Sequence, residues 1–197
     1  QSLEKNVVFD EDMKTFAHSD LRRMQQGGID VQVFSVWCDG SYGKGRAFAR
    51  ANREIDTLYE WVKRNPASMM IVRTPRELQQ AVQAKKLACM LGVEGGHMIE
   101  NNLQYLDSLY KRGVRYMTLT WNNSTPWATS AMDESSGKFT NAKKGLNDFG
   151  IQVVKRMNQL GMMVDLSHVG EQTFWDAIHT TTKPVIVSHS CAYTLCP

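Results

Sequence analysis

Three residues that can bind a metal ion each follow a short apolar run in this sequence. Glu94 follows LACMLGV, His168 follows MMVDLS and His189 follows PVIVS. Because the carboxyl ends of parallel strands meet on one face of a barrel, we expect the three side chains to lie together there. Two imidazoles and a carboxylate suit Zn²⁺ or a similar ion, and a carboxylate can also bridge two ions. The pattern therefore predicts a metal site and, as a hypothesis, a metallohydrolase.

The residues around these three have expected supporting roles. Gly95 and Gly96 allow the backbone to turn sharply, and we expect His97 to shape that turn rather than to bind metal. Asp165 lies three residues before the first histidine, on the opposite side of the strand's pleat, so we expect it to be a structural partner and not a ligand. Serines that flank the histidines could orient their rings: Ser167, Ser188 and Ser190.

Several other functions lack support in the sequence. There is no GxSxG motif for a serine nucleophile, and no GxGxxG follows an expected strand, which argues against a nucleotide-binding domain. The formal charge of +3 comes from 23 basic and 20 acidic residues spread along the chain, so nucleic acid is not an expected partner. No apolar run reaches the ~18 residues of a membrane-spanning segment. The four cysteines lack CxxC spacing, and Cys89 is expected to be a buried core thiol.

Short apolar or β-branched runs alternate with longer stretches of helical periodicity. This alternation is typical of βα units and predicts an α/β fold with a parallel sheet. Thr74, Pro75 and Glu77 form an N-terminal helix signal, so a short helix should run to about Ala84. Three further helices are indicated by apolar stripes around residues 48–62, 103–110 and 149–160. The expected strands are Ile29–Trp37, Leu87–Val93, Val114–Thr120, Met162–Ser167 and Pro184–Ser188.

The segment Gly92-Val93-Glu94-Gly95-Gly96-His97 resembles the membrane (renal) dipeptidase family, zinc peptidases with an amidohydrolase-like barrel. The resemblance implies a (β/α)8 TIM-type barrel, of which this chain would carry about strands two to six. Other segments resemble family segments in the same order: Gly27-Gly28, QVFSVW at 32–37, RYMTLT at 115–120, TPWA at 125–128, DLSHV at 165–169 and SHS at 188–190.

The same resemblance implies a binuclear zinc site. Glu94 would bridge two ions, and His168 and His189 would complete the shell of the second ion. The first ion would take its remaining ligands from a His-x-Asp motif at the end of the first strand. His18-Ser19-Asp20 has that spelling, but no apolar strand precedes it, so we do not expect His18 or Asp20 to bind metal.

These assignments predict that the chain begins after the first strand of the barrel. It also ends just past the strand that carries His189, whereas a complete barrel typically needs about 250 residues. We therefore expect residues 1–197 to be a single catalytic barrel domain truncated at both ends. The family's late catalytic Asp and the Arg that holds the substrate carboxylate would then lie outside the chain. An open sheet would leave unpaired edges, to be covered by more chain or by a partner.

Trp121 is a departure from the family pattern. After the segment RYMTLT, well-studied members carry a His thought to stabilise the tetrahedral intermediate, whereas this chain has a tryptophan. An indole is only an N–H donor and does not titrate near neutrality, so oxyanion stabilisation from this position is weakened. We expect the irregular stretch 121–144, with Trp121 and Trp127, to contact a substrate side chain.

The resulting hypothesis is a zinc-dependent dipeptidase, with two zinc ions per complete chain and hydrolysis through a metal-bridging water. One alternative keeps the barrel and the metals but acts on another amide, a lactone or a D-configured substrate. Another is a non-catalytic, metal-binding barrel that binds a peptide or a partner protein. A dipeptide is the expected small-molecule partner, a homodimer stays open, and the sequence does not determine the compartment.

Overall fold

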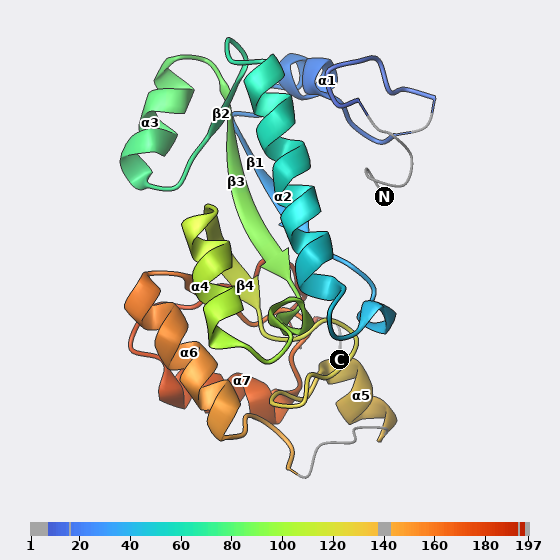
Figure 1. The fold of residues 1–197 in the computed structure, drawn as a ribbon, viewed down its shortest axis with the longest axis vertical. Helices are drawn as coiled ribbons and strands as arrows, with labels where there is room; N and C mark the ends of the chain where they lie inside the picture. The colour runs from blue at the N-terminus through green and yellow to red at the C-terminus, as the bar shows by residue number, and fades with distance from the viewer. Residues whose placement is uncertain (1–7, 16, 138–142, 193, 196–197) are drawn as a thin grey trace.

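The computed structural model describes residues 8–15, 17–137, 143–192 and 194–195, and they form a parallel sheet covered by helices (Figure 1). The strand order is β1-β3-β4-β5, and the short β2 also pairs with β3. Every pairing is parallel, which confirms the predicted α/β class. The strands are β1 (Val31–Val36), β2 (Met69–Ile71), β3 (Leu87–Glu94), β4 (Val114–Thr118) and β5 (Met163–Asp165).

The central strand is β3, because it pairs with β1 along one edge and with β2 and then β4 along the other. Six of its eight residues are buried, with only Met90 and Glu94 partly exposed. A strand buried on both faces is expected to be a nearly continuous apolar run, as LACMLGV is. Glu94 is therefore a polar residue at the end of the most enclosed strand in the described structure.

One expected strand is absent, and one observed strand was not expected. Pro184–Ser188 does not form a strand; only Ile186 makes a parallel bridge, to Asp165. The N–H of Ile186 donates to Val164 O and its carbonyl accepts from Leu166 N, both at 2.9 Å. Two residues later, the backbone N–H of Ser188 donates to the side chain of Asp165 and not to a backbone carbonyl of the sheet. The strand β2 was not predicted, because three residues are too short to show a period.

Four α-helices, α2, α3, α4 and α6, lie where the sequence predicted them, whereas α1, α5 and α7 were not predicted. The expected helix after Thr74 is confirmed: the Thr74 side chain accepts a hydrogen bond from Glu77 N. Gly161 ends its helix in the left-handed conformation, with φ 76°, as a glycine C-cap should. The α-helices are α1 (Leu21–Gln26), α2 (Ala47–Arg64), α3 (Pro75–Gln83), α4 (Leu103–Lys111), α5 (Ala131–Ser136), α6 (Asp148–Leu160) and α7 (Glu171–Thr180); the 3-10 turns are η1 (Gly40–Tyr42) and η2 (Gly96–Ile99).

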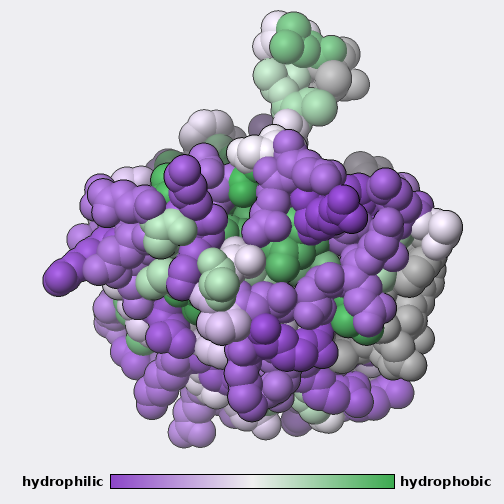
Figure 2. All heavy atoms as spheres, turned by 90° about the horizontal axis from the view of Figure 1, so that it is seen from above, coloured by the Kyte–Doolittle hydropathy of each residue, from purple (hydrophilic) through white to green (hydrophobic). Residues whose placement is uncertain are grey.

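Apolar faces of these helices pack on the sheet and make one main core. Ile55 and Leu58 of α2 are buried, as are Val153, Val154 and Met157 of α6. Figure 1 shows α4, α6 and α7 as neighbours at one end of the molecule. Seen from above, the surface is mostly hydrophilic, and hydrophobic side chains show between the polar ones (Figure 2). No helix in the described ranges is long and apolar enough to cross a membrane.

The stretch 121–144 is more regular than expected. It contains an antiparallel bridge between Thr125 and Ala128, followed by α5. Trp127 is only 1% exposed, and its indole ring lies close over Gly96. A Cβ at position 96 would clash with this ring, so the contact requires glycine. Burial of this tryptophan anchors the segment against the turn that follows β3. Residues 138–142 lie outside the described residues.

Candidate metal centre

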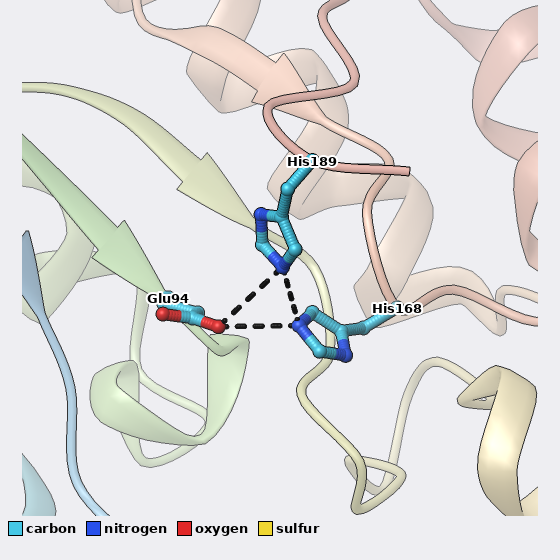
Figure 3. A group of neighbouring side chains, drawn as sticks. All are labelled: Glu94, His168 and His189. Atoms are coloured by element: carbon cyan, nitrogen blue, oxygen red, sulfur yellow. Dashed lines mark hydrogen bonds and ion pairs between the residues drawn. The ribbon is translucent and has the colours of Figure 1, made fainter. Parts of the chain in front are cut away.

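Two strand ends and a segment bridged to the sheet bring the three side chains singled out from the sequence to one point. Glu94 is the last residue of β3, His168 follows β5 by three residues, and His189 follows the Ile186 bridge. Figure 3 shows all three side chains directed at a common centre. The Glu94 Oε1 atom lies 3.1 Å from His168 Nε2 and 3.6 Å from His189 Nε2, and the two Nε2 atoms are 2.7 Å apart.

This triangle of donor atoms has the size of one face of a tetrahedral zinc site. Bonds of about 2.0–2.1 Å to nitrogen and oxygen separate neighbouring tetrahedral ligands by about 3.3 Å. The three edges here, 2.7, 3.1 and 3.6 Å, lie around that value. Two imidazole nitrogens and a carboxylate oxygen facing one point are groups that a cation can hold together. The residues present therefore fit a metal ion.

Glu94 presents its two oxygens to different partners. Oε2 accepts a hydrogen bond from Ser35 Oγ at 2.9 Å, and Oε1 faces the histidines. Ser35 belongs to β1, which pairs with β3 in register, with Ser35 opposite Gly92. The sequence did not mark Ser35 as a site residue; a hydroxyl in the β-branched and apolar end of the run VQVFSV was the available signal.

His168 has a left-handed backbone, with φ 63°, which is uncommon for a residue other than glycine. Its carbonyl accepts hydrogen bonds from Ala131 N at 2.8 Å and from Thr120 Oγ1 at 3.1 Å. These two contacts join the loop after β5 to the segment after β4. The strained conformation is thus held by neighbouring segments and turns the imidazole toward Glu94.

His189 lies on an exposed segment, and its ring contacts the preceding residue. Its Nδ1 is 2.9 Å from Ser188 Oγ, as expected for a serine that orients the ring. Ser167 acts differently: its Oγ accepts the backbone N–H of His189 at 3.1 Å. The hydroxyl of Ser190 donates to Cys191 O and does not orient a ring in this structure.

Asp165 is fully buried beneath this segment, and neutral donors surround its carboxylate. Burial raises the pKa of this carboxyl, but hydrogen bonds from Ser188, Thr118 and Ser167 outweigh it, so the net pKa lies below the ordinary value. The expectation that Asp165 is a structural partner to a neighbouring loop agrees with these contacts. The partners are hydroxyl and backbone N–H groups.

The remaining histidine motifs lie apart from the centre. His97 Nε2 is 2.9 Å from Cys38 O, and burial lowers the pKa of this imidazole. The carboxylate of Asp20 caps α1 through Arg23 N and pairs with the Arg23 guanidinium. The candidate metal group in the described residues contains neither His97 nor the pair of His18 and Asp20.

Trp121 packs next to the metal centre rather than inside it. Its ring meets that of Trp37, at the end of β1, edge to face, with centroids 4.9 Å apart. A Cβ at Gly95 would lie 3.3 Å from the Cβ of Trp121, so this tryptophan lies against the turn after Glu94. An open hollow of about 1120 Å³ is lined by His168, Val169 and Phe174, among other residues.

A parallel α/β sheet that brings a carboxylate and two imidazoles together at its strand ends has the arrangement of a barrel metallohydrolase. Comparison with known sequences identifies the family within this class. The family described as membrane dipeptidase (peptidase family M19) matches residues 2–197. The chain belongs to this family.

Curated relatives are similar over almost the whole chain. Dipeptidase 3 from Homo sapiens and from Macaca fascicularis are each 36% identical over 194 residues, which is 98% of this chain and 39% of theirs. The chain therefore spans well under half the length of these relatives. A metallopeptidase of family M19, the dipeptidase AC, has a TM-score of 0.88 at 21% identity, covering all of this chain and 61% of its own. The predicted barrel-type fold agrees with this likeness.

Proposed function

We propose that the protein is a zinc-dependent dipeptidase. The observation that carries the proposal is the convergence of Glu94 Oε1, His168 Nε2 and His189 Nε2 beside the carboxyl ends of the parallel strands β3 and β5. Membership of the membrane dipeptidase family supports a peptide substrate for such a site. The substrate would be a dipeptide, hydrolysed at its one peptide bond.

The finer part of the proposal is a binuclear centre. Glu94 would bridge two zinc ions, and His168 and His189 would complete the shell of one of them. Zinc bound here would supply Lewis acidity, which lowers the pKa of a bridging water and polarises the scissile carbonyl. Glu94 then acts as a ligand and not as a general base. Ser35 supports this role, because its hydroxyl holds Oε2 while Oε1 faces the histidines.

A second candidate keeps the metal centre but changes the reaction. Trp121 follows the segment RYMTLT, at the position where the family resemblance implies a histidine. An indole does not titrate and so cannot assist the reaction by proton transfer. This favours either another amide or lactone substrate, or a metal-binding barrel without turnover. The wall formed by Trp37 and Trp121 would in both cases contact the bound molecule.

Hydrolysis of a dipeptide panel by the full-length protein separates these candidates. The panel contains L,L- and L,D-dipeptides, because a Rhodobacter sphaeroides metallopeptidase of similar fold (TM-score 0.78, 20% identity, 91% of this chain and 58% of its own) was solved with a phosphinate mimic of L-Ala-D-Ala. The protein is first stripped with a chelator and then reloaded with zinc. Zinc-dependent turnover supports the dipeptidase; bound zinc without turnover on any dipeptide would contradict it and favour the second candidate.

A further inference from the structure

Asp165 is a buried carboxylate whose contacts lead to the metal centre. It is 0% exposed and accepts five hydrogen bonds in the described part of the chain, all from neutral groups. Oδ1 accepts from Ser167 N, Ser167 Oγ and Ser188 N at 3.0–3.2 Å. Oδ2 accepts two shorter bonds of 2.6 Å, from Thr118 Oγ1 and Ser188 Oγ. One carboxylate thus connects β4, β5 and the segment that carries His189.

This connection matters because the segment carrying His189 has little other support. In the part of the chain that the structure describes, it bridges the sheet at Ile186 alone, and Val187 is 47% exposed. Both the backbone N–H and the hydroxyl of Ser188 are held by Asp165. A buried charged acceptor makes stronger hydrogen bonds than a neutral one, so Asp165 anchors this exposed segment from below.

The direction of the hydrogen bonds then selects one form of the His189 ring. The hydroxyl of Ser188 has a single proton, and the carboxylate of Asp165 at 2.6 Å is its strongest acceptor. Ser188 Oγ can therefore only accept at its 2.9 Å contact with His189, which requires the proton on Nδ1. The lone pair of Nε2 is left facing His168 Nε2 and Glu94 Oε1.

We propose that Asp165 and Ser188 are positioning residues for the metal centre: the carboxylate acts through the Ser188 hydroxyl to hold His189 in its Nδ1-protonated form, with Nε2 directed at the metal position. This inference rests on the proposed zinc site. Partners of this kind behind a histidine ligand typically change metal affinity about 10- to 100-fold when removed.

The first test uses metal-free, full-length protein labelled with ¹⁵N at histidine. We expect the nitrogen chemical shifts of His189 to show Nδ1 protonated in the parent protein. Both Ser188→Ala and Asp165→Asn should shift His189 toward a mixture of tautomers, and Ser188→Thr, which keeps a hydroxyl, should restore the parental spectrum. A parental His189 spectrum in Ser188→Ala would overturn the proposal. This readout does not depend on whether the protein binds zinc.

The second test measures zinc affinity by competition with a chelator at a temperature where all variants are folded. Ser188→Ala should bind zinc about 10- to 100-fold more weakly, and the double variant with Asp165→Asn should lose little more, since both act on one ring. Thr173→Val is the matched control, because it removes a buried hydroxyl that bonds Thr129 and contacts neither Asp165 nor His189. Equal losses in Thr173→Val and Ser188→Ala would show a merely structural effect and contradict the proposal.

If Asp165→Asn fails to fold, Ser188→Ala alone decides the outcome, because its hydroxyl is at the exposed end of the connection. If the parent binds no zinc while the tautomer test behaves as expected, the proposed zinc site fails and the positioning of His189 stands.

Discussion

The carboxylate of Glu94 lies at a strand end with its two oxygens facing different partners, as the proposed metal ligand would need. Its Oε2 is bonded to a serine of the neighbouring strand, and its Oε1 faces two imidazole nitrogens. Side-chain exposures of 23% for Glu94 and 21% for His168 leave the pair open to an ion from solvent. The proposed binding of an ion therefore depends on the carboxylate of this one residue.

Replacing that side chain gives the first prediction. Glu94→Ala should abolish zinc binding, because the remaining imidazoles lack the anionic ligand that faces both of them. Zinc content is measured by metal analysis after dialysis of the full-length protein. Glu60→Ala, which removes an exposed carboxylate from α2, should retain the parental zinc content. Two zinc ions bound to Glu94→Ala would disprove the assignment of the bridge.

Trp121 carries the second prediction. Trp121→His places a titratable donor where the family resemblance implies one, so kcat on dipeptides should rise about ten-fold or more. The same change loses the edge-to-face contact with Trp37, so the melting temperature should fall. Trp175→His is the control: Trp175 is 49% exposed on α7, and its replacement should leave kcat unchanged. An unaltered kcat in folded Trp121→His would mean that the position does not contact the reacting group.

Among the elements, the short helix α1 depends on its cap. Asp20 accepts from Arg23 N at 2.8 Å, from Met13 N at 3.2 Å and from the Arg23 side chain at 2.7 Å. Hydrogen bonding from Arg23 N, the largest cause, and the Arg23 guanidinium lower the pKa of this carboxyl from 3.8 to about 2. The segment His18-Ser19-Asp20, whose sequence matches the His-x-Asp metal motif, therefore lies at the start of helix α1 in the structure.

This cap makes stability depend on pH in a defined window. Because the folded-state pKa is below the unfolded value, the ionised Asp20 stabilises the fold above about pH 4 and loses that effect as the pH falls through about 2. Asp20→Asn should thus unfold at lower urea concentration than the parent at pH 7, with the difference shrinking between pH 4 and pH 2. A difference in midpoint that stays constant over this range would show that the charge of Asp20 is not involved.

For the whole molecule, the proposed metal centre joins segments from three separate parts of the chain. Glu94 closes β3, while His168 and His189 lie on the loop and the segment that follow β5. An ion that binds only when these parts are assembled stabilises the folded state by mass action. Metal binding and folding should therefore be coupled in this protein.

We expect zinc to raise the melting temperature of the stripped full-length protein. A free concentration 100 times the dissociation constant adds about 2.7 kcal/mol, which corresponds to a rise of a few degrees, smaller the longer the protein that unfolds as one unit. The shift is measured by calorimetry with zinc and, as a control ion with different ligand preferences, with magnesium. Glu94→Ala should show no zinc-dependent rise, whereas an equal rise in this variant would place zinc elsewhere.

The sequence by itself determined the α/β class, the main helices and the family. These depend on local information: the period of apolar residues, helix caps such as Thr74, and short segments that follow each strand. Glu94, His168 and His189 were found because parallel strands all end on the same side, which makes the position after a strand informative without knowing the neighbours. The extent of the domain and the zinc assignment of these residues stay predictions.

Only the tertiary structure decided which side chains support those three. Ser35 contacts Glu94 across 59 residues of sequence, and Thr118 contacts Asp165 across 47, because strand pairing and register bring them together. It also showed that Pro184–Ser188 makes one bridge instead of a ladder, and that His168 has a left-handed backbone. A period along the chain reports which face a residue occupies, whereas a hydrogen bond across strands depends on which strands are neighbours, and that is settled only when the whole sheet forms.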